Sequence, residues 1–391
     1  MNRKLVLFAL ACAVVATPVF AASYIVPPDD AFIRKSETIV VAHALNSHVV
    51  NSAATGIETV TDFSVSEILK GYPTSVVHVH LPGGVFGETI RAIGDAPTFT
   101  EGDDYLLFLN HRADGDFGPV DFGLGVFVFS DEQDRRTVSR SAEVFGWDRD
   151  GGAHLEFRRD ADAFLEYIRA IRDGGEPAQN YLLPTPANMT HESLYRPAPV
   201  LEATSFTGTS YMLVCGGGGE GCRWNGFPVN WNQGNSEPGA GGTPAGKQAI
   251  TAAFSSWNGA GVGINYVYAS SNANLNGTLE QQDPNTTDHV NNIVFEKDLS
   301  SLGFGPYSCG GGGLLGYGGI SRASGTNTHN SETYVTTLEA EVSMNQGIAN
   351  CTSLFNSGDF NTAVTHELGH TLGLRHADQN RSGGACDSSL D

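Results

Sequence analysis

Three histidines and one glutamate near the end of the sequence have the spacing of a metal site. His366 and His370 are four residues apart, so on a helix their side chains project from one face and can reach the same ion. Glu367 follows the first histidine directly and is placed to take the proton of a metal-bound water. Gly373 can end the helix, since glycine adopts positive φ without steric cost, and the turn then delivers His376 as a third ligand.

Three protein ligands leave the fourth coordination position to water. That is the arrangement of a catalytic zinc site, whereas a structural site closes the position with protein. With this chain's composition, the full pattern would arise by chance on the order of one time in ten thousand or less. The sequence therefore predicts one catalytic Zn2+ ion held by His366, His370 and His376, with Glu367 as the general base.

The residues from His366 to His376 resemble the motif of the metzincin clan of zinc endopeptidases, and within that clan the matrixin-like branch. Weaker similarity extends back to about Cys222. The resemblance implies an α+β catalytic domain with a mixed sheet. It also implies a secreted zinc-dependent endopeptidase that hydrolyses peptide bonds in proteins through a zinc-bound water activated by Glu367.

The glycine-rich stretch 310–319 carries the predicted substrate contacts. In matrixin-like enzymes the stretch at this position forms the edge strand that lines the cleft, here from Leu314 to Ile320, and glycines let a substrate backbone approach closely. The resemblance implies that Leu315, Gly316 and Tyr317 bind an extended protein or peptide substrate through backbone hydrogen bonds. The alternative is a flexible glycine-rich loop.

The chain departs from the clan at its C-terminal end. Metzincins have a methionine-containing turn beneath the metal, after the third histidine, but the last methionine here is Met344 and the sequence ends at Asp391. We therefore expect the protease domain, residues 206–391, to be truncated at its C-terminus. The competing hypothesis is a non-catalytic secreted binding or adhesion protein with a vestigial metal site.

Residues 1–21 have the features of a secretory signal peptide. Two basic residues precede an apolar run from Leu5 to Val15, and small residues precede the expected cleavage site after Ala21. The run is too short to span a bilayer. A lipoprotein site at Cys12 is the alternative. We expect a secreted protein, periplasmic or extracellular, with no membrane insertion after the signal is removed.

The overall composition limits the classes of partner that the protein is expected to bind. Acidic residues outnumber basic ones by 43 to 22, which gives a formal charge of −21 and argues against nucleic-acid binding, because that needs a basic surface. Export favours disulfides among the five cysteines that remain after Cys12 is removed. Cys215 and Cys222 flank four glycines and could close a small ring. Cys309, Cys351 and Cys386 cannot all pair with one another. The oligomeric state stays open.

The first half of the mature chain, residues 23–172, is predicted to be a small, mostly-β domain, a barrel or sandwich, with a barrel of the oligonucleotide/oligosaccharide-binding type as one candidate. Strands are expected at 39–42, 60–71, 76–81, 105–109 and 126–129, with a closing helix at 160–172. His78 and His80 share a strand face, which is either a solvated face or a surface metal site. A proline-rich linker, residues 173–205, follows. We expect this first domain to restrain the second.

The second domain is predicted to alternate strands and helices ahead of the zinc motif. Strands are expected at 227–231, 264–268, 293–295 and 339–344, and a helix from Thr243-Pro244 onward. The loop 269–292 could hold Ca2+ through oxygen ligands, with a solvated loop as the alternative. Asp359 is expected to cap the zinc helix. The predicted buried residues of the two helices are Ile250, Ala253, Phe254 and Trp257, and Ala363, Val364 and Leu368.

Overall fold

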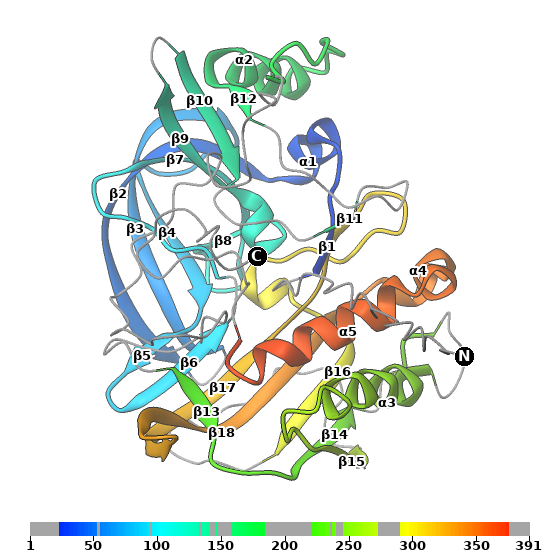
Figure 1. Ribbon diagram of the computed structural model, residues 1–391. Helices are drawn as coiled ribbons and strands as arrows, with labels where there is room; N and C mark the ends of the chain where they lie inside the picture. The colour runs from blue at the N-terminus through cyan, green and yellow to red at the C-terminus, as the bar shows by residue number, and fades with distance from the viewer. Residues whose placement is uncertain are drawn as a thin grey trace, which may run out of the picture.

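The computed structural model describes residues 23–52, 55–93, 96–132, 135–140, 146–147, 158–183, 221–234, 237–239, 245–272 and 290–374. Over these residues the protein is a mixed α+β fold dominated by two large sheets, with few helices (Figure 1). The predicted coarse fold class is therefore confirmed. None of the described helices is long and apolar enough to cross a membrane.

One sheet of eight strands belongs to the N-terminal part of the chain. Its order is β12-β10-β9-β7-β2-β3-β4-β8, and β8 also pairs with β7. The five strands β7-β2-β3-β4-β8 therefore close on themselves as a barrel does, which leaves no free edge among them. The strands are β2 (Thr38–Ser52), β3 (Gly56–Lys70), β4 (Val76–Pro82), β7 (Asp104–His111), β8 (Phe117–Pro119), β9 (Val126–Glu132), β10 (Arg135–Arg140) and β12 (Arg159–Asp160).

Both faces of this sheet are covered. Val40 and Ala42 on β2 belong to one apolar core, and the alternate residues Ile39 and Val41 belong to another, as the two-residue period of a strand requires. The second core includes helices α1 (Asp29–Lys35) and α2 (Ala161–Arg172). The expected helix at 160–172 is confirmed, with the Asp160 side chain accepting a hydrogen bond from the helix N-terminus.

The second sheet has ten strands drawn from both sides of the predicted linker. Its main order is β11-β1-β17-β18-β16-β14-β15, with β13 beside β18, β6 beside β17, and β5 beside β6. The strands are β1 (Ser23–Ile25), β5 (Gly84–Phe86), β6 (Thr89–Ile93), β11 (Gly146–Trp147), β13 (Cys222–Trp224), β14 (Val229–Gly234), β15 (Tyr266–Asn272), β16 (Asn291–Lys297), β17 (Gly313–His329) and β18 (Glu332–Asn345). Every strand predicted in the second domain is present.

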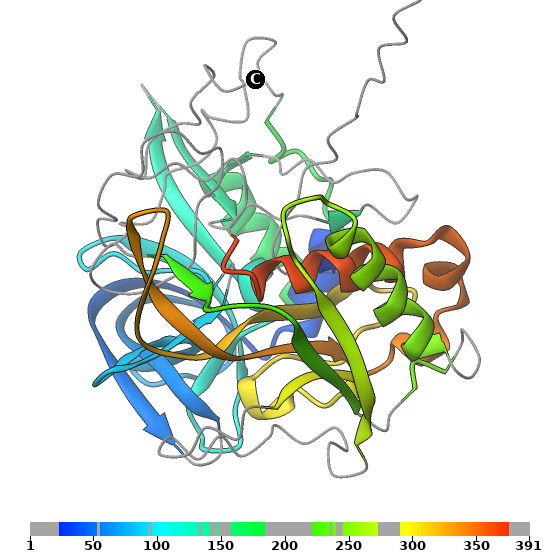
Figure 2. The ribbon, with the colours of Figure 1, turned by 60° about the horizontal axis from the view of Figure 1, so that its bottom comes forward.

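Helices α3 (Ala245–Asn258) and α5 (Asp359–His370) lie side by side against this sheet, and the short α4 (Thr352–Ser357) precedes α5 (Figure 2). The predicted buried residues of both helices are buried, except that Trp257 is only half-buried. The prediction that Asp359 caps α5 is wrong. Gly358 occupies the cap with φ +86°, and no side chain caps the helix.

A disulfide joins Cys309 to Cys351, 42 residues apart, so the cysteine-based prediction of disulfides is confirmed at this pair. Cys222 is also disulfide-bonded. The predicted signal peptide, most of the linker and most of the possible calcium loop lie outside the described residues.

Candidate metal centre

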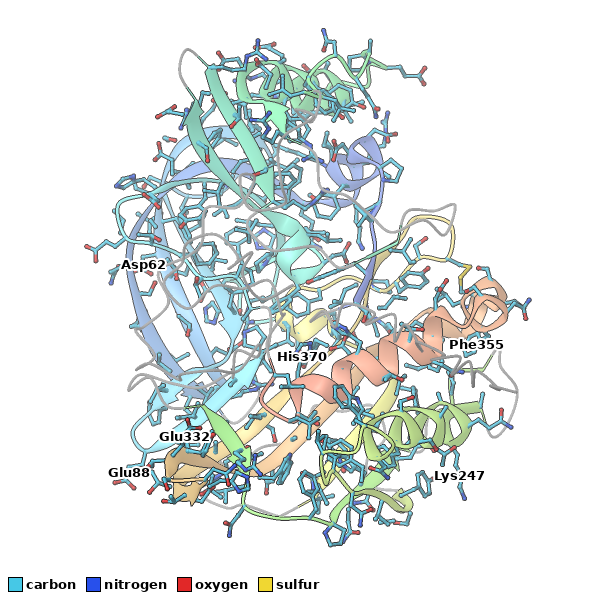
Figure 3. The ribbon with its side chains drawn as sticks, viewed as in Figure 1. Asp62, Glu88, Lys247, Glu332, Phe355 and His370 are labelled. Atoms are coloured by element: carbon cyan, nitrogen blue, oxygen red, sulfur yellow. A yellow bond between two sulfur atoms is a disulfide. The ribbon has the colours of Figure 1, made fainter. Side chains whose placement is uncertain are left out.

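Helix α5 carries the motif at its C-terminal end. Phe360, Ala363, Val364 and Leu368 form its buried face, with the spacing of an amphipathic helix. Glu367 lies seven residues after Phe360, on the same face, which explains how local periodicity buries a carboxylate. Figure 3 shows His370 near the middle of the molecule, at the end of α5 away from Phe355 on α4. The helix thus delivers its polar end to the interior.

His366 and His370 meet as their spacing predicts. Both side chains are buried, and their Nε2 atoms are 3.2 Å apart. His370 Nδ1 lies 2.8 Å from the carbonyl oxygen of Leu374. A carbonyl only accepts, so Nδ1 donates its proton and Nε2 presents its lone pair towards the other ring. Two ring nitrogens converging in this way suit a shared cation.

The turn after the helix holds this end in place. Gly373 has φ +83°, as predicted, and a Cβ there would clash with the carbonyl oxygen of Cys222. The Trp224 indole N–H donates to the carbonyl oxygen of Thr371 (2.8 Å), and the Tyr266 hydroxyl donates to the Thr371 hydroxyl (2.8 Å). Sequence reasoning missed the supporting roles of Trp224, Tyr266 and Thr371. Predicted ligand His376 follows the turn and lies outside the described residues.

Glu367 is fully buried beside the two histidines, and its carboxylate contacts the first described residue of the chain. Its Oε1 atom accepts hydrogen bonds from the Ser23 backbone N–H (2.9 Å) and the Ser23 hydroxyl (2.7 Å). Burial raises the pKa of Glu367 to about 8, although the bonds from Ser23 and from the Gly318 backbone oppose that rise. Oε2 has no hydrogen-bond partner among the described residues.

From Gly313 onward the glycine-rich stretch forms strand β17, so its interpretation as a flexible loop is wrong there. Leu315, Gly316 and Tyr317 lie on β17, which passes so close to α5 that a Cβ at Gly318 would clash with the Glu367 backbone. The Leu315 and Tyr317 side chains are buried in two different cores. Their expected roles in substrate binding therefore depend on the backbone, and those roles stay a prediction.

In this structure β17 is not an edge strand, contrary to the expectation for residues 314–320. One of its sides pairs with β18. The other pairs with β1 between Gly313 and Gly316, and with β6 from Gly319 to Ala323. Both β1 and β6 come from the N-terminal part of the chain. The sequence could not show this, because the pairing joins segments far apart in the chain.

The histidines of β4 have separate roles. His78 is exposed and 2.6 Å from Asp62, as a solvated face would have it. His80 is buried, so the interpretation as a solvated face is wrong for this residue. Its Nε2 donates to Asp116 (3.0 Å) and its Nδ1 lies 3.5 Å from Glu58.

Within the described part of the chain, His366, Glu367 and His370 form the one group of three compact enough to hold a metal ion, with ligand atoms within 4.8 Å of one another.

No protein-family model matches the chain, and no curated protein is significantly similar to it. The case for a function therefore depends on the chemistry of the residues themselves. That chemistry is two converging imidazoles, a buried glutamate between them in sequence, and a strand of the neighbouring sheet directly beside that glutamate.

Proposed function

We propose that the protein is a zinc-dependent endopeptidase that hydrolyses peptide bonds in proteins. The observation that carries the proposal is the approach of the His366 and His370 Nε2 atoms to 3.2 Å beside the buried carboxylate of Glu367. Among the described residues the Glu367 carboxyl group has no cationic partner and its Oε2 atom has no hydrogen-bond partner, so its burial is costly. Cation binding would offset that cost.

The residues present fit a zinc ion. His366 and His370 would hold it through Nε2, the hydrogen bond from His370 Nδ1 to Leu374 would fix one ring, and His376 is the predicted third ligand. Three imidazole ligands leave one position open, as in catalytic sites. When bound, such an ion lowers the pKa of water and polarises a carbonyl oxygen.

Glu367 is placed to move protons. One carboxylate oxygen, Oε2, has no hydrogen-bond partner among the described residues, so it is available to accept the proton of the attacking water. The same group then passes the proton to the leaving amine, which would otherwise depart as an unstable anion. Burial of the carboxylate keeps bulk water away from this transfer.

A peptide substrate would bind in extended form to β17, next to Glu367, in place of β1 on the side of β17 that β1 now pairs with. Backbone pairing of this kind is insensitive to side chains, so the site supports protein hydrolysis without indicating a preferred sequence. Leu315, Gly316 and Tyr317 are the expected partners, through their backbone N–H and C=O groups.

Three variants test the proposal in the full-length protein. Glu367→Ala should keep its zinc and lose turnover of a generic protein substrate by about 10²- to 10⁴-fold. His366→Ala and His370→Ala should instead lose the metal, because the remaining ligands under-coordinate it. Asp359→Ala, a carboxylate change at the start of the same helix, is the matched control and should change neither metal content nor turnover.

Metal content and hydrolysis together decide between the hypotheses. Stoichiometric zinc without hydrolysis by any form of the protein would support the non-catalytic binding protein with a vestigial site. Hydrolysis by Glu367→Ala at the wild-type rate would contradict the role given to this carboxylate.

A further inference from the structure

The first described strand of the chain occupies the predicted substrate position. Strand β1 pairs antiparallel with β17, in the register Ser23 with Gly316, Tyr24 with Leu314 and Ile25 with Gly313. The Leu314–Gly316 part of this stretch is where an extended peptide is expected to pair. A substrate would need the same backbone groups, so it and β1 cannot bind together.

The same strand also occupies the catalytic carboxylate. Oε1 of Glu367 accepts two hydrogen bonds from Ser23, one from its backbone N–H and one from its hydroxyl. From Ser23 the chain runs away from Glu367 along β17. It therefore lies like the C-terminal product of a cleavage, with its amino end at the site. Removal of residues 1–21 would leave Ser23 as the second residue of the mature chain.

The barrel anchors β1 firmly in this position. Tyr24 is fully buried, and its hydroxyl accepts a hydrogen bond from the Gly123 N–H (3.3 Å). Just after β1, α1 supplies Lys35, whose ammonium group lies 2.7 Å from both carboxylate oxygens of the buried Asp121. Strand β6 covers the next part of the same side of β17, from Gly319 to Ala323.

We propose that β1 is an intramolecular inhibitor of the protease site, held in place by the Ser23–Glu367 contact, and that activation requires its displacement. The proposal rests on the proposed function. It gives the expected restraint by the first domain a physical means, namely the pairing of β1 with β17.

Two substitutions of Ser23 weaken the contact in steps. Ser23→Ala removes the hydroxyl donor and keeps the backbone N–H, while Ser23→Pro removes both donors at the first residue of a strand, where proline is tolerated. Ser36→Ala is the matched control. It deletes another buried hydroxyl of the same domain, one that donates to the Phe32 carbonyl oxygen (2.8 Å) and not to Glu367.

The probe is a peptide with the strand's own sequence, residues 23–28, labelled at its C-terminus with a fluorophore. Its binding to the full-length protein is followed by fluorescence anisotropy, and zinc content and peptidase turnover are measured on the same samples. Loss of one buried hydrogen bond should raise both peptide affinity and turnover about 10-fold in Ser23→Ala. Ser23→Pro should raise them further, and Ser36→Ala should leave both unchanged.

The outcomes separate the two proposals. If the Ser23 variants bind the peptide no better than the wild type, β1 does not compete for the site, and the inference is overturned even if all forms are active. If peptide binding rises but zinc-loaded variants still hydrolyse nothing, β1 does occupy the strand side as proposed, and the protease function is what fails.

Discussion

Two buried glutamates in this protein each lie beside a histidine, yet their environments shift their pKa values in opposite directions. Glu58 lies in the barrel, where Arg112 donates two hydrogen bonds to its two oxygens (2.9 and 3.0 Å). His80 and Thr55 add further contacts. Among the described residues, the donors to Glu367 on α5 are uncharged: Ser23 and the backbone of the nearby strand.

The two pKa values follow from these donors. Burial by itself raises the pKa of each carboxyl group, since it penalises the charged form. At Glu58 the nearby His80 and the hydrogen bonds from Arg112 together outweigh burial and lower the pKa to about 2. At Glu367 burial prevails and the pKa rises to about 8. A buried carboxyl group with hydrogen-bond partners for both oxygens stabilises a fold. A buried carboxyl group with an oxygen that lacks such a partner is a candidate for chemistry.

The largest effect that would test this comparison is on stability. Glu58→Gln leaves the buried Arg112 guanidinium with only the half-exposed Asp114 as an anionic partner. We expect the free energy of unfolding to fall by about 3–5 kcal/mol, with turnover per folded molecule unchanged, measured by urea denaturation and peptidase assay. Asp104→Asn, which loses only exposed pairs, should change stability by less than about 1 kcal/mol. Equal losses of stability in the two variants would show that the buried Glu58–Arg112 pair stabilises the fold no more than an exposed pair does.

The second effect is a dependence of stability on pH. The pKa of Glu58 is about 2 in the folded protein and 4.5 as the ordinary value, so this group contributes stability above pH 4.5. That contribution, about 3 kcal/mol, should be lost as the pH falls from 4.5 towards 2. The free energy of unfolding, measured at pH 5, 4 and 3, should fall with pH in the wild type. In Glu58→Gln it should fall less, by the contribution of Glu58. Identical slopes would contradict the low pKa.

The smallest effect concerns one neutral donor. The Thr55 hydroxyl donates to Glu58 Oε2 (2.6 Å), and Thr55→Val removes it while keeping the side-chain shape. We expect a loss of about 1 kcal/mol in the free energy of unfolding and a small rise in the pKa of Glu58, followed by carboxyl-resolved NMR titration. Ser47→Ala on β2, whose hydroxyl bonds Thr61 and no charged group, is the control. A larger loss of stability in Ser47→Ala than in Thr55→Val would contradict the importance of the hydrogen bond to the carboxylate.

The candidate metal site on α5 and the residues around Glu58 differed in how much of each the sequence could predict. The four-residue interval between His366 and His370 is read within a single helix, and the turn at Gly373 depends on its own φ. Both were predicted because the forces that set them act between near neighbours. His80 was not predicted as buried, because its partners Glu58 and Asp116 come from other segments.

By itself, the sequence determined the strand and helix pattern, the buried stripe of α5, the pair of histidines and the placement of Glu367 beside them. Only the tertiary structure decided what faces that glutamate. Ser23 and Glu367 are 344 residues apart, and no local periodicity connects residues at that distance. Strand pairing with β17 can be satisfied by any backbone that reaches it. The packing of the barrel against the second sheet, and not a motif, therefore selected β1 as its partner.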